Sequence, residues 1–209
     1  MDTKTLWKTN VGSHMWGMNR PDSDVDIFEA YSVPTKSILR GRARQNSHNS
    51  KIDGNDIAKH EVEKVMEMLI KGNLNFVLGV MSPIIIQDSH ELQLIRSIFK
   101  QNLSKNIYHS IHGMAVHNYQ KYFEKEKDVT WKKLAQVLRL LNFGNTLLLE
   151  EKVEFKAIPW ETTIHIDEIR QKILDLDRAY GESNLPGAPD EELYRDWLEV
   201  IRMNDLKFR

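Results

Sequence analysis

Two short stretches near the N-terminus combine residue types that could do phosphate chemistry. Gly12 and Ser13 form the first, and Asp24 and Asp26 form the second after a spacer of ten residues. In an extended strand the side chains at positions i and i+2 point to the same face, so the two carboxylates would lie side by side. Carboxylate oxygens suit Mg²⁺, and N–H groups at a tight turn entering a helix can hold phosphate oxygens. The sequence therefore predicts a site for a divalent cation and a phosphate-bearing ligand.

This segment resembles the signature of the DNA polymerase β-like nucleotidyltransferase superfamily. That signature consists of an apolar residue, Gly-Gly or Gly-Ser, a spacer, and two acids that alternate with apolar residues; here it reads Val11-Gly12-Ser13 and Asp24-Val25-Asp26-Ile27. Two later stretches, residues 71–75 and 138–149, are similar to the branch of predicted nucleotidyltransferases linked to RNA repair. The resemblance implies a Mg²⁺-dependent nucleotidyltransferase that moves an NMP from an NTP such as ATP to a hydroxyl acceptor, with an RNA end favoured as the acceptor.

A third carboxylate is expected, because two-metal sites place two ions about 3.5–4 Å apart and two acids rarely suffice to hold them. In the superfamily this acid comes from a neighbouring strand, and Asp56 is our candidate. Asp53 and Glu61 compete with it. The alternative for Asp56 is that it merely closes a turn or caps a helix.

Basic residues supply candidates for phosphate binding. The stretch between residues 36 and 59 is opposed only by Asp53 and Asp56 and carries Lys36, Arg40, Arg42, Arg44, Lys51 and Lys59. Because it directly follows the carboxylate strand, we expect Arg42 or a neighbouring arginine to contact phosphate. The resemblance adds Lys132 and Arg139, which share a helix face, and implies that Gly12 and Ser13 hold the β- and γ-phosphates. The alternative is a solvated charged surface, with Arg139 in a salt bridge.

The hydrophobic pattern predicts a short N-terminal α/β region followed by a helical C-terminal region. Residues 5–11 form either a short helix or a strand, residues 23–31 form the acid-bearing strand, and residues 53–56 close a hairpin. Helices are expected from residue 61 to Gly72-Asn73, in a short segment toward Met81, over residues 89–99, 104–125, 130–142 and 166–180, and after Pro189. We therefore predict an α+β fold, with a small mixed β-sheet nucleotidyltransferase core over residues 1–88 and a mainly helical bundle over residues 89–209.

Composition narrows the class of protein further. The chain has 209 residues and a formal net charge of −1, so global charge does not by itself indicate a nucleic-acid partner. It has no cysteine, which excludes disulfides and thiolate metal sites and fits a reducing cytoplasm. No apolar run approaches the roughly 20 residues of a membrane span. We expect a cytoplasmic protein without a membrane partner.

Two rival functions remain open at the level of sequence. Related enzymes modify proteins or small molecules, and a fold does not decide between such acceptors. A member of this fold could also be a non-catalytic module that binds a nucleotide or RNA. Intact Gly12, Ser13, Asp24 and Asp26 favour catalysis.

Overall fold

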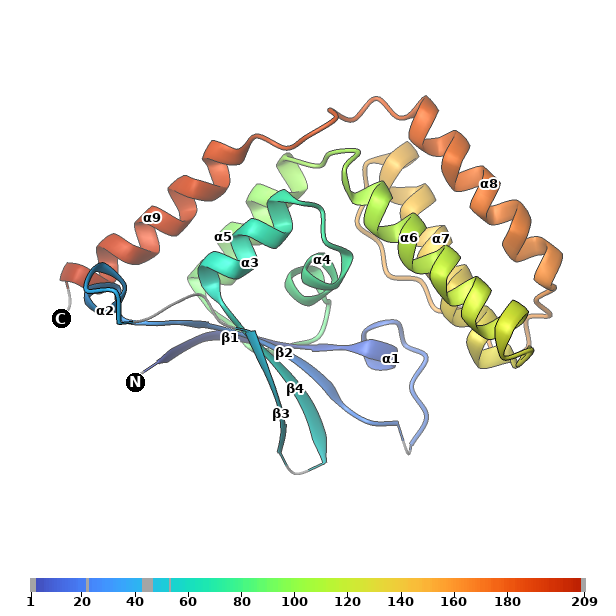
Figure 1. The fold of residues 1–209 in the computed structure, drawn as a ribbon, viewed down its shortest axis with the longest axis horizontal. Coiled ribbons are helices and arrows are strands. Elements are labelled where there is room, and N and C mark those ends of the chain that lie inside the picture. Colours follow the sequence, from blue (N-terminus) through green and yellow to red (C-terminus); the bar gives the residue numbers. More distant parts are fainter. Residues whose placement is uncertain (1–2, 22, 43–46, 53, 208–209) are drawn as a thin grey trace. The chain divides into compact units, whose positions relative to one another are not determined.

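The strands of the chain form one five-stranded mixed β-sheet (Figure 1). The computed structural model describes residues 3–21, 23–42, 47–52 and 54–207. Within them the strand order is β3-β4-β2-β1-β5. The strands are β1 (Lys4–Val11), β2 (Asp26–Ser32), β3 (Ser47–Ile52), β4 (Asn55–Glu61) and β5 (Ile85–Gln87). This sheet and the helices that follow it confirm the predicted α+β class.

The pairing within the sheet sets which residues face each other. Strands β2 and β4 are parallel, with Asp26 opposite Asp56, whereas β1 pairs antiparallel with β2 and places Val11 opposite Asp26. Strands β3 and β4 form an antiparallel hairpin. In its turn Gly54 has a φ of 84°, a left-handed conformation that favours glycine, and Asp53 lies outside the described residues. The predicted hairpin is thus confirmed.

The chain divides into two compact units. The first contains Met1–Met15, Asn19–Asn102 and Asp190–Arg209, and the second contains Trp16–Met18 and Leu103–Pro189. The sequence-based division lay after residue 88, whereas the first unit continues to Asn102 and takes in the C-terminal helix. The unit that carries the sheet is therefore discontinuous in sequence.

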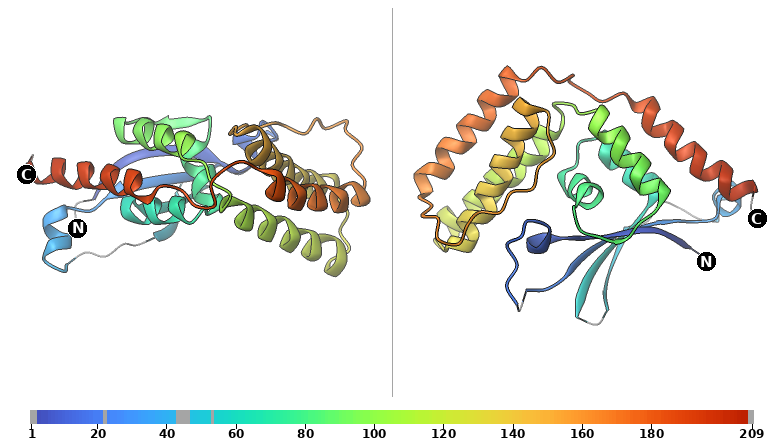
Figure 2. Two further views of the ribbon diagram at one scale, coloured as in Figure 1. Left: turned by 90° about the horizontal axis from the view of Figure 1, so that it is seen from above. Right: turned by 180° about the vertical axis from the view of Figure 1, so that it is seen from behind.

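Helices of the first unit cover one face of its sheet. Figures 1 and 2 show α3, α4 and α5 on the same side of the strands, and α9 beside α5. These helices pack closely, because a Cβ at Gly79 of α4 would lie 2.2 Å from Cδ2 of Phe28 in β2. The helices of this unit are α1 (Gly12–Met15), α2 (Thr35–Leu39), α3 (Val62–Ile70), α4 (Leu74–Met81), α5 (His90–Gln101) and α9 (Glu191–Lys207).

The segment between β2 and β4 is more regular than expected. Apart from the hairpin turn at residues 53–56, no helix or strand was predicted between residues 31 and 61, but α2 and β3 both form there. The side chains of β3 are mostly exposed, so this strand lacks the apolar alternation by which a strand is usually recognised. Its pairing with β4 provides the backbone hydrogen bonds that the sequence pattern does not reveal.

The second unit is helical. It contains α6 (Ile107–Tyr119), the π-helix η1 (Gln120–Lys125), α7 (Trp131–Glu150) and α8 (Ile166–Glu182). Helix α7 continues eight residues beyond its predicted end at residue 142, because Leu147 and Leu148 extend its buried face. Gly144 lies inside the helix, where a Cβ would meet Cδ1 of Leu176 at 2.7 Å. Among the described helices, none combines the length and apolar character needed to cross a membrane.

Gly79→Ala is expected to destabilise the protein by about 1–3 kcal/mol, although alanine is the better helix former. The new methyl group would overlap the Phe28 ring in a packed core. The midpoint of urea-induced unfolding measures the effect. Gly113→Ala is the matched control, because no described atom outside its chain neighbours and the nearby backbone of α6 lies within 4 Å of its Cβ position. That variant should gain about 0.5–1 kcal/mol, and equal effects of both substitutions would contradict the packing argument.

Candidate functional site

Two carboxylates face each other on neighbouring strands. Asp26 begins β2 and lies opposite Asp56, the second residue of β4. The backbone N–H of Asp56 donates a hydrogen bond to the carbonyl oxygen of Val25 at 3.1 Å, which ties the two strands together at this end. Asp24 is exposed and lies two residues before Asp26. The structure thus brings together the acid end of β2 and the candidate third acid on β4.

The Gly-Ser turn lies directly against one of these carboxylates. β1 ends at Val11 opposite Asp26, and Gly12 begins the short helix α1 with a φ of 67°. A Cβ on Gly12 would lie 2.1 Å from Oδ2 of Asp26. Only glycine combines this left-handed conformation with so close an approach. The two stretches that the spacer separates in the sequence are therefore neighbours, with the backbone of the turn beside the carboxylate.

The electrostatics of this group favour a cation. Burial raises the pKa of Asp26, and the charges of Asp56 and Asp24 raise it further, while His14 lowers it. Nζ of Lys51 lies 3.7 Å from Oδ1 of Asp56, but this ion pair is exposed and therefore weak. Negative charge is thus concentrated at Asp26, where a positive ion would relieve the repulsion.

The donor atoms fit Mg²⁺ by their chemistry. Mg²⁺ prefers carboxylate oxygens and is usually bound through one or two of them together with substrate phosphates. In the described part of the chain, no three His, Cys, Asp or Glu side chains are grouped so that they could by themselves hold a metal ion. Asp24, Asp26 and Asp56 stay the predicted ligands of the ion, and oxygens of a substrate would have to complete its coordination.

Of the two competing third acids, Glu61 does not join this group. Glu61 is fully buried at the opposite end of β4, where its carboxylate accepts a hydrogen bond from the backbone of Glu63 and caps α3. Asp53 lies outside the described residues. Asp56 lies within a strand and does not cap a helix, so it stays our candidate.

The structure does not bring Arg42 to the carboxylates. Strand β2 begins at Asp26 and ends at Ser32, and helix α2 follows the end of the strand. Six residue steps along a strand correspond to about 20 Å. Arg42 is exposed beyond α2, and Arg44 lies outside the described residues. The strand carries the loop that follows it away from Asp26, so contact of Arg42 with a phosphate stays a prediction.

Arg139 belongs to the second unit and is largely buried. Its guanidinium lies 5.2 Å from the ring of Trp16, and its Nη1 lies 4.0 Å from Sδ of Met18. Burial lowers the pKa of Arg139 to about 10. Among the described residues it forms no ion pair with a carboxylate, and its buried Nε has no hydrogen-bond partner. The salt bridge considered from sequence is therefore not formed there. Lys132 is exposed on the same helix, and the roles of both residues stay predictions.

Sequence reasoning did not name His14 as a site residue, and it named Lys51 only as a member of the basic stretch. His14 follows Ser13 directly, and its charge acts on Asp26. Its Nε2 lies 3.5 Å from the carbonyl oxygen of Ser23, so the ring links α1 to the segment that leads to the acids. Lys51 is placed next to Asp56 by the hairpin register. The place of His14 directly after the Gly-Ser motif could have identified it from sequence. The place of Lys51 beside Asp56 could not be predicted without the pairing of β3 with β4.

His60 makes the stability of the first unit depend on pH. Its ring lies 4.9 Å from that of Phe28 and 4.5 Å from that of Phe76. Burial, together with the charges of His48 and Lys64, lowers the pKa of His60 from 6.5 to about 4. Between these two values the unfolded chain binds a proton that the folded protein does not bind. The free energy of unfolding should therefore fall by about 1–2 kcal/mol as the pH drops through this interval, after allowing for solvent screening.

Urea unfolding between pH 4 and pH 7 measures this dependence. His60→Phe should reduce the loss of stability on acidification, since phenylalanine does not titrate. His90→Gln is the control, because His90 is exposed on α5, and it should retain the wild-type dependence. A His60→Phe variant with an unchanged pH dependence would assign the effect to other groups.

Comparisons with known proteins find similarity over most of the chain. A sequence model of the family described as "RNA repair pathway DNA polymerase beta family" matches residues 1–180. This match includes the Gly-Ser turn and all three acids, and it ends before α9. A solved structure of a nucleotidyltransferase-like protein from Exiguobacterium sibiricum 255-15 has a TM-score of 0.32 and 13% sequence identity, and the alignment covers 96% of this chain and 74% of that one.

Two curated relatives are similar to parts of the chain. An uncharacterized protein of Methanocaldococcus jannaschii is 29% identical over 150 residues, which make up 70% of this chain and 60% of the relative. An uncharacterized 38.9 kDa protein of Enterobacteria phage T4 is 36% identical over 62 residues, which make up 30% of this chain and 18% of the relative. The chain thus spans less than two thirds of the length of either relative.

Proposed function

This chain belongs to the RNA repair pathway DNA polymerase beta family, and on that premise we propose that it is a Mg²⁺-dependent nucleotidyltransferase that acts on a hydroxyl of an RNA end. One observation carries the proposal: Asp26 has Asp56 opposite it on the neighbouring strand and the backbone of Gly12 against its carboxylate. The family's description supports RNA as the acceptor.

The reaction would transfer an NMP from an NTP. The acceptor oxygen attacks the α-phosphorus in line, the bond from that phosphorus to the bridging oxygen breaks, and pyrophosphate leaves. Asp56 accepts the proton of the acceptor hydroxyl. Asp24, Asp26 and Asp56 would hold Mg²⁺, which when bound neutralises charge on the triphosphate and on the leaving pyrophosphate.

The remaining roles concern the phosphates. Gly12 and Ser13 would hold the β- and γ-phosphates through backbone N–H groups and the serine hydroxyl. Arg139 would bind a phosphate group of a substrate, because a buried guanidinium without a carboxylate partner is costly unless an anion compensates it. Lys132 would contribute as an exposed cation of the same helix.

Incubation with Mg²⁺ and each α-³²P-labelled NTP tests the proposal, with total RNA or with no added acceptor. Label on RNA that appears with the wild type and not with Asp24→Asn/Asp26→Asn is the expected result. Label on the protein itself would contradict RNA as the acceptor and indicate a protein-modifying enzyme. Label on neither, with Mg²⁺-dependent NTP binding intact, would contradict transfer and indicate a nucleotide-binding module.

A further inference from the structure

Helix α9 completes the unit that carries the carboxylates, although it lies beyond the family match. Trp197 is almost fully buried, with its ring 6.2 Å from that of Trp7 in β1. Its Nε1 donates a hydrogen bond to the carbonyl oxygen of Glu91 in α5 at 3.1 Å. Tyr194 and Ile201 are buried beside it on the same helix. The last helix is therefore part of this unit's core.

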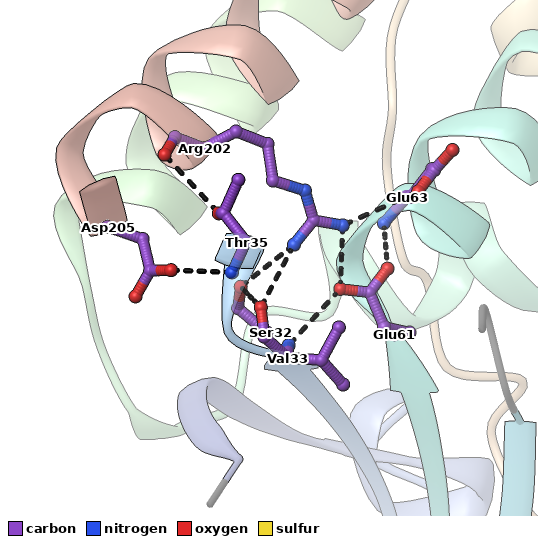
Figure 3. A network of polar contacts seen from close by, with 7 residues as sticks. All are labelled: Ser32, Val33, Thr35, Glu61, Glu63, Arg202 and Asp205. Carbon is purple, nitrogen blue, oxygen red and sulfur yellow. Dashed lines mark hydrogen bonds and ion pairs between the residues drawn. The ribbon is translucent and has the colours of Figure 1, made fainter. Parts of the chain in front are cut away.

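One guanidinium on α9 joins the ends of two strands (Figure 3). Nη1 of Arg202 donates to Oγ of Ser32 at 3.1 Å and to the carbonyl oxygen of Val33 at 3.3 Å, at the end of β2. Nη2 donates to Oε1 of Glu61 at 2.8 Å, at the end of β4. A weaker contact of 3.5 Å reaches Oε2 of Glu63. Arg202 thus links β2, β4 and the start of α3.

Glu61 makes this link costly to lose. Its side chain is fully buried, and Oε1 also accepts a hydrogen bond from the backbone N–H of Val33 at 3.4 Å. The carboxylate therefore joins β4 to β2 directly, and Arg202, with a side chain only 13% exposed, compensates its charge. A buried carboxylate that loses its partner is left uncompensated. We call this ion pair of Arg202 and Glu61 the clamp. Its two charges stabilise the strands only when both are present.

The clamp acts on the two strands that carry the acids. β2 and β4 pair in parallel without a register shift from Asp26 opposite Asp56 to Tyr31 opposite Glu61. Like charges repel at the first end, and the clamp draws the strands together at the other. We propose that Arg202 is a positioning residue that holds the ends of β2 and β4 together and thereby sets the spacing of Asp26 and Asp56. Its effect on catalysis rests on the proposed function.

The test uses a double variant, so that no buried charge is left unpaired. Arg202→Met/Glu61→Gln removes both charges of the clamp, and Arg202→Lys keeps the charge but loses the planar fork. Arg195→Met is the matched control, because Arg195 is exposed on the same helix and pairs with Glu191. The primary readout is hydrogen exchange of the Asp56 amide, which bonds to the carbonyl oxygen of Val25 between the acid ends.

We expect exchange of the Asp56 amide to become about tenfold faster in the double variant and to stay unchanged in Arg195→Met. Displacement of the metal ligands should also weaken Mn²⁺ binding, which is measured calorimetrically without nucleotide, and it should lower kcat. We expect each effect to be about tenfold, which is the lower end of the effects seen for residues that orient metal ligands. The KM for NTP should stay unchanged. Arg202→Lys should lie between the double variant and the wild type.

Two outcomes separate this inference from the proposed function. A folded double variant with wild-type exchange at Asp56 and wild-type Mn²⁺ affinity would overturn the inference and leave Arg202 as a stabilising residue only. A wild-type protein that transfers no nucleotide would overturn the proposed function instead. In that case exchange at Asp56 still decides the role of Arg202, because the amide reports on the strands without any reaction.

Discussion

Asp26→Asn is expected to reduce nucleotidyl transfer by about a thousandfold, the order found when a single electrostatic contact to a transition state is removed. Asp26 lies between the Gly-Ser turn and Asp56, so its charge acts where both the cation and the phosphates are proposed to bind. Asparagine has nearly the same shape but no charge. Initial rates with labelled NTP and excess RNA measure the loss.

The same substitution should make the protein harder to unfold. Burial and the charges of Asp56 and Asp24 raise the pKa of Asp26 above 3.8. The folded state therefore binds this proton more tightly than the unfolded state, and at pH 7 the ionised carboxylate lowers the free energy of unfolding. Asparagine removes that cost. The urea midpoint of Asp26→Asn in EDTA should exceed that of the wild type at pH 7, and the difference should fade below pH 3.8, where the carboxyl is protonated in both states.

Asp196→Asn is the matched control, because Asp196 is exposed on α9. It should change neither the rate nor the urea midpoint. Wild-type rates for Asp26→Asn would remove Asp26 from the reaction and with it the proposed Mg²⁺ site. A lowered midpoint at pH 7 would contradict the electrostatic cost assigned to the carboxylate.

Gly12→Ala is expected to reduce both stability and transfer. The left-handed φ of 67° costs an alanine about 1–2 kcal/mol, and its methyl group would lie 2.1 Å from Oδ2 of Asp26. Relief of this overlap requires the turn or the carboxylate to move, so we expect a total loss of about 2–3 kcal/mol. Displacement of the proposed metal ligand should lower the rate of transfer by about a hundredfold.

Gly41→Ala separates the two causes. Gly41 has a φ of 66°, but apart from its chain neighbours no described atom lies within 4 Å of its Cβ position. It therefore carries the conformational cost alone, and should lose about 1–2 kcal/mol without losing activity. Urea unfolding and initial rates of both variants give the difference. Equal effects of the two substitutions would show that the contact with Asp26 does not explain why glycine is needed at position 12.

Local patterns in the sequence determined much of this fold. The apolar spacing of α3, α5 and α8 follows the helical period, and these helices lie close to their predicted bounds. Gly54 predicted the hairpin, because a left-handed turn needs a residue without a side chain. Gly12-Ser13 and Asp24-Val25-Asp26 identified the candidate site, because the alternation of a strand and the demands of phosphate and metal chemistry are local properties of the chain.

The tertiary structure decided which distant residues meet these stretches. The parallel pairing of β2 with β4 places Asp56 opposite Asp26 and carries Glu61 to the far end. The course of β2 separates Arg42 from Asp26, because Asp26 begins the strand and the chain leaves it at Ser32. The return of α9 to the first unit depends on burial of Trp197 against Trp7. Hydrophobic periodicity shows which face of a segment is buried, but it does not show which other segment packs against that face. Sheet order and packing depend on contacts between residues far apart in the chain.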